Sequence, residues 1–251
     1  MANDGLLEQG RILSIRSGHN VRELGGYDTP HGMTCRHRFL RSGSTRLLSH
    51  EDLDVLRAWG VHYVLDLRGI GETPEVTCPF AKLDWVQWRN IPLYDRDLSA
   101  PAMAPIRAAG SFLATSYLTM LRSQGCIRRI FAFLAQAGPE DCVLFHCAAG
   151  MDRTGVLSML LLGLAEVSRR DIIADYVYSF GTVPEVDALL DDDVSEVTAN
   201  LQDSPLTRRL QTIATAYDTV IAAHGSIGGY LQSCGVPNTD VDAVRAHLID
   251  A

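Results

Sequence analysis

A cysteine and an arginine with five residues between them form the pattern that most directly implies chemistry. Cys147 and Arg153 lie in CVLFHCAAGMDRTGVLSMLLLGLAEV, residues 142–167. The apolar runs on both sides indicate a buried strand before the loop and a buried helix after it. Loop amides and the positive end of the helix dipole would then point at one site, which suits an oxyanion. Arg153 can offer its planar guanidinium to two oxygens of a phosphate.

The same loop predicts a nucleophile at Cys147. A helix N-terminus and a neighbouring arginine favour the thiolate, and Thr154 is placed to donate a hydrogen bond to the sulfur. A thiolate beneath an anion cradle is arranged for in-line attack on phosphorus, which gives a phosphocysteine that water hydrolyses. The cradle and Arg153 would supply the charge stabilisation that Mg²⁺ supplies elsewhere, so we expect no metal and no cofactor. The predicted phosphate-binding residues are Ala148, Ala149, Gly150, Met151 and Thr154.

The specificity of this loop comes from its combination of residues. With 6 cysteines in 251 residues, the bare spacing is expected by chance about 0.5 times. Requiring histidine before the cysteine, glycine at the third loop position and serine or threonine after the arginine lowers that expectation to roughly 10⁻⁴. A tight strand-to-helix turn around a core cysteine is the weaker alternative.

The loop resembles a known signature, and other segments extend the resemblance. HCAAGMDRTG is similar to the HCxxGxxR(S/T) loop of cysteine-dependent phosphatases, and more narrowly to HCxxGKDRTG of the bacterial tyrosine-phosphatase family. NVRELGGY, RSGSTRL, VLDLRGIGE and GSIGGYLQSCGV follow the order of that family between residues 20 and 236. The resemblance implies the phosphatase fold and hydrolysis of phosphate monoesters. Phosphotyrosine in proteins is the expected substrate, with phosphoserine, phosphothreonine and small phosphate esters as further ones.

The general acid is the role for which the sequence offers several candidates. A leaving alcohol needs a proton, and the phosphocysteine then needs a base. Asp152 lies inside the loop, and the resemblance implies that the matching aspartate takes this role. Asp95 follows a predicted strand 52 residues upstream of Cys147, where other cysteine phosphatases carry a mobile acid loop. We favour Asp152, then Asp95, then Asp97; a solvated turn is the alternative for the last two.

Two departures from the family pattern bear on the substrate. Met151 stands where the family loop has lysine, and Glu23 replaces the aspartate of the N-terminal element. The resemblance associates the lysine with phosphoinositide turnover, because a second cation helps to hold highly charged head groups. We therefore expect monophosphate esters to be preferred, with a phosphoinositide phosphatase as one alternative. A catalytically impaired phosphate-binding module, a sulfurtransferase and an arsenate reductase are the others.

Apolar and β-branched runs predict the strands that would position the loop. Strands alternate with helices in the first two-thirds of the chain, and helices alone follow. This order indicates an α/β fold, with a mainly parallel central sheet flanked by helices and a helical C-terminal part. No segment has the composition of an interdomain linker, so we expect one domain over residues 1–251. The predicted strands lie near residues 38–41, 61–67, 83–93 and 142–146.

Helix boundaries are predicted from capping residues. Ser49 is a candidate N-cap, and Gly60 is where that helix should stop. Ser168 with Asp171 three residues later resembles a capping box. Ser204 followed by proline predicts the start of a long helix that runs to about residue 224.

Polar residues near the predicted strand ends could support the loop. Asp66 and Arg68 could line the pocket or form a buried ion pair beneath it. Arg22 has the same two readings. We expect His146 to orient the loop through hydrogen bonds, and Asn20 with Gly25 and Gly26 to shape a turn near the site. Residues 99–110, rich in alanine and proline, are predicted to form a surface excursion, and the acidic run at residues 191–193 a solvated loop.

Composition excludes several classes of function. The net charge of −8 argues against a protein that lies along nucleic acid or an anionic membrane. Six scattered cysteines fit a reduced compartment, and the N-terminus lacks the apolar stretch of a secretory signal. The most apolar run, Val156 to Val167, is shorter than the roughly 20 residues of a membrane helix. We expect a cytoplasmic protein without stable membrane association, whose partner is a phosphorylated protein or a small phosphate ester.

Overall fold

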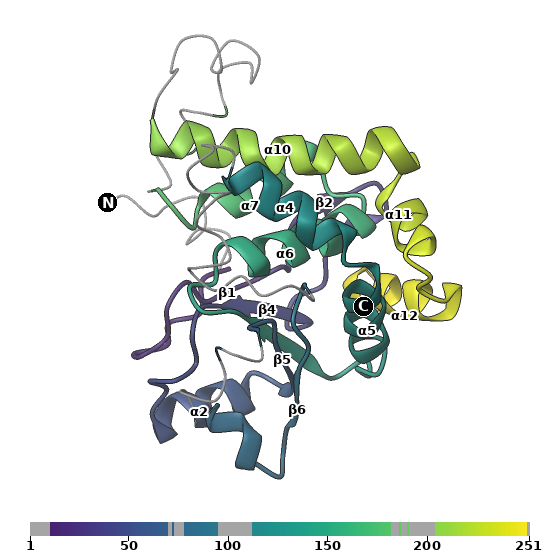
Figure 1. The fold of residues 1–251 in the computed structure, drawn as a ribbon. Coiled ribbons are helices and arrows are strands. Elements are labelled where there is room, and N and C mark those ends of the chain that lie inside the picture. The colour runs from purple at the N-terminus through teal and green to yellow at the C-terminus, as the bar shows by residue number, and fades with distance from the viewer. Residues whose placement is uncertain are drawn as a thin grey trace.

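Figure 1 shows the chain as a computed structural model, which describes residues 11–69, 72, 78–94, 112–181, 186, 190 and 204–249. Asp95 and Asp97 lie outside these described residues, as do the segments 99–110 and 191–193. A five-stranded sheet forms the centre of the described part, and helices cover both of its faces. The predicted α/β class is confirmed.

The sheet is mainly parallel, with the strand that precedes the loop at its centre. Its spatial order is β1-β4-β7-β5-β6, with β1 antiparallel to β4 and the other neighbours parallel. Because β7 is buried on both faces, its sequence is an unbroken apolar run up to His146. The strands are β1 (Arg22–Glu23), β4 (Phe39–Ser42), β5 (Val61–Asp66), β6 (Gln87–Asn90) and β7 (Cys142–His146), and a separate hairpin pairs β2 (Asp28–Thr29) with β3 (Gly32–Met33).

The predicted strand over residues 83–93 is longer than the strand observed there. A 3₁₀ helix, η2 (Pro79–Lys82), and a turn precede it, so pairing with β5 begins only at Gln87. The strand ends at Asn90, two residues before Pro92, which has no amide to donate to a ladder. The other three strand predictions differ from the structure by one residue at most.

The carboxyl ends of three parallel strands meet at one edge of the sheet. In the register of β4, β7 and β5, Ser42 and Asp66 both lie opposite His146. The next amide along the chain, that of Leu67, donates to the carbonyl oxygen of His146 at 2.8 Å. The segments that follow these strands therefore begin beside Cys147.

The two faces of the sheet are covered by different helices. In Figure 1, α6, α4, α7 and α10 lie on one side of the sheet and α2 lies on the other. Phe145 faces the α6 side, whereas its neighbour Leu144 packs with Leu56 and Phe80 on the α2 side, as strand alternation requires. The helices are α2 (His50–Ala58), α4 (Phe112–Arg122), α5 (Gln124–Leu134), α6 (Asp152–Leu164), α7 (Arg169–Val177), α10 (Pro205–His224), α11 (Ile227–Ser233) and α12 (Asn238–Ile249).

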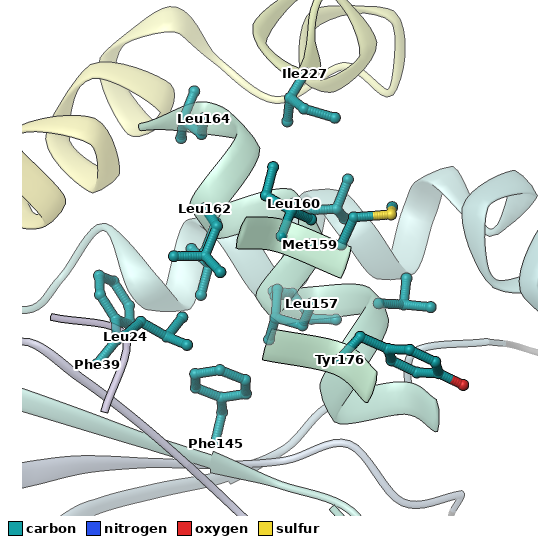
Figure 2. Close-up of a cluster of buried hydrophobic side chains, with 14 of the residues drawn as sticks. Leu24, Phe39, Phe145, Leu157, Met159, Leu160, Leu162, Leu164, Tyr176 and Ile227 are labelled. Atoms are coloured by element: carbon teal, nitrogen blue, oxygen red, sulfur yellow. The ribbon is translucent and has the colours of Figure 1, made fainter. Parts of the chain in front are cut away.

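Helix α6 is buried on all sides, which fixes the loop at its N-terminus. Figure 2 shows Leu157 and Leu162 directed toward Phe145 and the sheet, while Leu160 and Met159 point toward the helices above. Because full burial of one leucine is worth roughly 1.5–3 kcal/mol, the buried leucines of α6 hold the helix firmly against the sheet. No helix in the described part of the chain has the length and apolar character needed to cross a bilayer.

Capping residues set the helix ends largely as predicted. Ser49 caps α2 in a reciprocal capping box with Asp52, and Gly60 follows the helix with a φ of +95°. Ser204 caps α10, which ends at His224. At α7 only half of the predicted box forms: the Ser168 side chain accepts from the amide of Asp171, and the reciprocal bond is absent.

Candidate active site

The loop of residues 147–151 connects the centre of the sheet to the buried helix. Cys147 follows β7 and is 2% exposed, whereas Ala148 and Ala149 are exposed. Met151 is the N-cap of α6 and makes no side-chain cap hydrogen bond, so the first amides of the helix have no side-chain acceptor at this position. Uncapped amides beside a buried thiol form a strand-loop-helix site of the predicted kind.

Gly150 is fixed by both its conformation and its surroundings. Its φ is +70°, and a Cβ there would lie 2.5 Å from the amide nitrogen of Gly43 and 2.6 Å from the carbonyl of Ser42. Its own carbonyl oxygen accepts hydrogen bonds from Nδ2 of Asn20 at 2.8 Å and Nη2 of Arg41 at 2.9 Å. The segments around β4 thus hold the loop, and no larger residue fits at position 150.

Arg153 is braced by a carboxylate that the sequence did not single out. Nη1 and Nη2 donate to the two carboxylate oxygens of Glu72, the second at 3.0 Å, and the guanidinium carbon lies 5.8 Å from the ring centre of Tyr94. Burial opposes the charge of Arg153, but the hydrogen bonds that it donates to Glu72, together with the nearby Cys147, raise its pKa. Glu72 therefore holds one edge of the guanidinium, and the edge carrying Nε has no hydrogen-bond partner among the described residues.

Asp152, the first residue of α6, lies in a cluster that the sequence did not predict. Its Oδ1 accepts from the hydroxyl of Tyr117 at 2.7 Å and from Nη1 of Arg209 at 2.5 Å. The hydroxyl of Tyr176 lies 3.5 Å from the same oxygen. These partners come from α4, α10 and α7, so only the folded chain brings them to the loop.

A second aspartate lies below the loop, where it binds two buried arginines. Asp175 accepts from Nε of Arg22 at 3.0 Å through Oδ1 and forms an ion pair with Arg41 through Oδ2. Tyr27 donates to Oδ1 at 3.2 Å, and Ser179 contacts both arginines. Burial raises the pKa of Asp175, but the two arginines more than offset this and hold it below its usual value. Of the two readings of Arg22, the structure supports the buried ion pair.

The residues after β5 support the loop from its other side. Arg68 donates to both carboxylate oxygens of Asp66 at 2.6–3.1 Å, and both side chains are buried. Nδ1 of His146 lies 3.3 Å from the carbonyl oxygen of Cys147, in line with an orienting role. Burial lowers the pKa of His146. Of the two readings of Asp66 and Arg68, the structure supports the buried ion pair.

One predicted contact is wrong. Thr154 is fully buried, and its Oγ1 has no hydrogen-bond partner among the described residues, so it does not donate to the sulfur of Cys147. The helical backbone begins at Asp152, two residues earlier, and this places Thr154 within the first turn of α6. Asp95, the second candidate for the general acid, lies outside the described residues.

Comparisons with known proteins agree with this geometry. The model of the tyrosine phosphatase family matches residues 13–250. A protein of Cupriavidus necator, provisionally named a tyrosine-protein phosphatase, is 31% identical over 255 aligned residues, which cover 96% of this chain and 90% of that protein. The tyrosine-protein phosphatase of Nostoc commune is 30% identical over 84% of this chain and 74% of its own. The triple specificity protein phosphatase PtpB of Mycobacterium tuberculosis is 31% identical over 51% of this chain and 50% of its own.

Proposed function

Because the chain belongs to the tyrosine phosphatase family, we propose that Cys147 is its nucleophile, Arg153 its phosphate clamp and Asp152 its general acid and base. The protein is a phosphoric monoester hydrolase of the tyrosine phosphatase type and acts on phosphorylated substrates. The match over residues 13–250 supports a single catalytic domain.

The proposed reaction has two displacements at phosphorus. The thiolate of Cys147 attacks the phosphorus, the bond to the leaving oxygen breaks, and Asp152 gives that oxygen a proton. Water then attacks the phosphocysteine and passes a proton to Asp152, while the phosphorus–sulfur bond breaks and the thiolate is restored. Arg153 and the loop amides stabilise the charge on the phosphoryl oxygens in both steps.

One observation carries this proposal: a buried thiol and a braced arginine lie at the two ends of a loop of fixed shape. Cys147 is 2% exposed, and Glu72 holds one edge of the Arg153 guanidinium. The glycine between them has a φ of +70° and leaves no room for a side chain. A phosphate needs this kind of preorganised site, because donors that are already in place need no reorganisation during the reaction.

Aryl monophosphates, phosphotyrosine above all, are the proposed substrates, with phosphoserine and phosphothreonine as additional ones. Met151 brings no charge to the loop, and Arg209, which reaches the loop from α10, is already paired with Asp152. We therefore expect monophosphates to be hydrolysed faster than polyphosphorylated inositol lipids. A panel of phosphopeptides and phosphoinositides tests this, and a preference for the lipids would contradict it.

The mechanism is tested by turnover of an aryl phosphate in EDTA. Wild type should be active, and Cys147→Ser should lose activity by at least about 10³-fold. Cys142→Ala is the matched control, because it removes a buried thiol from the first residue of β7, the strand that leads to Cys147, and should keep the activity. Equal rates for wild type and Cys147→Ser, or a strict requirement for metal, would refute the proposal.

A further inference from the structure

Asp152 is held through one of its two carboxylate oxygens. Oδ1 receives the Tyr117 hydroxyl at 2.7 Å and Nη1 of Arg209 at 2.5 Å. Among the described residues no donor reaches Oδ2. The side chain is 39% exposed, so the carboxylate lies at the rim of the loop and is open to solvent. One oxygen is thus anchored, and the other is available for proton exchange.

The hydroxyl groups around Oδ1 have a defined order of donation. Each tyrosine has one hydroxyl hydrogen, and Tyr117 directs its hydrogen to Asp152. Tyr176 lies 3.5 Å from Asp152 but in close contact with the Tyr117 hydroxyl, so its hydrogen goes to Tyr117. Burial, reinforced by Asp152, raises the pKa of both tyrosines, which therefore stay protonated as donors.

Arg209 is itself held by an aromatic ring. Its guanidinium carbon lies 4.4 Å from the ring centre of Phe180, whose ring lies 5.1 Å from that of Tyr176. Tyr176 packs against α6 at Gly155, where a Cβ would lie 2.5 Å from its ring. A glycine in α6, an aromatic pair at the end of α7 and an arginine of α10 thus form one packed unit around Asp152.

We propose that Arg209 is a positioning residue that, with Tyr117, anchors Oδ1 of Asp152 so that Oδ2 faces the leaving oxygen and the attacking water. This inference rests on the proposed acid and base role of Asp152. General acid catalysis contributes roughly 10²–10⁴-fold to the rate. Part of that factor depends on holding the acid within hydrogen-bond reach of the leaving oxygen. The anchor supplies that orientation from two helices outside the loop, α10 and α4.

The test compares a poor and a good leaving group. For each variant kcat/KM is measured with phenyl phosphate and with 4-nitrophenyl phosphate, whose leaving group needs little protonation. In Asp152→Asn, kcat/KM should fall about 100-fold with phenyl phosphate and by less than about tenfold with the nitrophenyl ester. In Arg209→Met, kcat/KM should fall about tenfold with phenyl phosphate and by less than about twofold with 4-nitrophenyl phosphate. Arg209→Lys should recover most of the loss, and Tyr117→Phe should show the same selective pattern as Arg209→Met.

A matched control is an arginine that also pairs with an aspartate across a contact of α10, but away from the loop. Arg169 of α7 donates two hydrogen bonds to Asp218 of α10, at 2.8 and 2.7 Å. Arg169→Met should leave unchanged the ratio of the kcat/KM values for the two substrates. A ratio for Arg209→Met equal to that of Arg169→Met, while Asp152→Asn remains selective, would overturn this inference alone. An unselective Asp152→Asn would overturn the proposed role of Asp152, and the inference with it.

Discussion

Two aspartates near the same loop have similar partners and opposite surroundings. Asp175 binds two arginines and a tyrosine, and its side chain is 1% exposed. Asp152 binds one arginine and a tyrosine, and its side chain is 39% exposed. Within the described part of the chain, both oxygens of Asp175 accept hydrogen bonds or ion pairs, whereas only Oδ1 of Asp152 does. Burial and full pairing make the first cluster structural, and exposure with an unused oxygen leaves the second able to exchange protons.

The stability of the protein should depend more on the charge of the buried Asp175 than on that of the exposed Asp152. Asp175→Asn keeps the shape of the side chain but leaves Arg22 and Arg41 without a counter-charge in the interior. We expect the free energy of unfolding to fall by about 3–5 kcal/mol, as is usual when one partner of a buried pair is removed. Urea denaturation measures this loss in the free energy of unfolding.

The matched control for this change is the exposed pair of Arg169 and Asp218. Asp218→Asn should cost under about 1 kcal/mol, because solvent screens a surface pair. A similar loss in the two variants would show that the Asp175 cluster is not the internal support that the geometry indicates.

The two clusters are joined by the loop, so a change at Gly150 should affect catalysis as well as stability. Gly150→Ala would push its Cβ into the backbone of Ser42 and Gly43, and the loop must shift. We expect kcat/KM for an aryl phosphate to fall about 100-fold, since a displacement of about 1 Å can have that effect. Gly225 has a similar φ of +75° with open space around it, so Gly225→Ala should keep the activity. Full activity of Gly150→Ala would contradict the account of the loop.

Removing Glu72 tests whether Arg153 depends on this partner for its orientation. Arg153 is 12% exposed and Glu72 is 41% exposed, so the brace is itself reachable by solvent. Glu72→Ala should lower kcat/KM about tenfold, because the guanidinium loses the partner that orients it. Glu51, which is 82% exposed, offers a control in Glu51→Ala. An increase in kcat/KM would mean that Glu72 competes with the substrate for Arg153 instead of orienting it.

The smallest expected effect is a dependence of stability on pH. Burial lowers the pKa of His146 and His247 below the ordinary value of 6.5, so the unfolded chain binds more protons just below that pH. The free energy of unfolding should therefore fall as the pH falls below about 6.5, and again below about 3.8, where unfolded Asp175 would be protonated. Urea titrations at several pH values measure the slope, which His247→Leu should reduce. A rise in stability over the same interval would contradict these assignments.

The sequence predicted the parts of the site that are local in the chain. A strand, a small-residue loop and a buried helix follow each other directly, so Cys147, Gly150 and Arg153 were found together. The central strand and the caps at Ser49 and Ser204 were also predictable, because each depends on near neighbours.

The partners of these residues were not predictable, because the fold brings them from distant segments. Arg209 is 57 residues from Asp152 along the chain, and Arg22 is 153 residues from Asp175. Glu72 lay within VLDLRGIGE, a segment noted for its resemblance, yet nothing local showed that its carboxylate reaches Arg153. Contacts of this kind depend on how strands and helices are ordered in space.

The covalent intermediate offers the most direct test of the central claim. Asp152→Asn should slow hydrolysis of the phosphocysteine, so the intermediate should accumulate when the variant is mixed with an aryl phosphate and quenched. Mass spectrometry of the digested protein should then find one phosphoryl group on the peptide that carries Cys147, and none in Cys147→Ser. A phosphoryl group on another residue, or turnover by wild type with no phosphorylated Cys147 under any quench condition, would contradict the account.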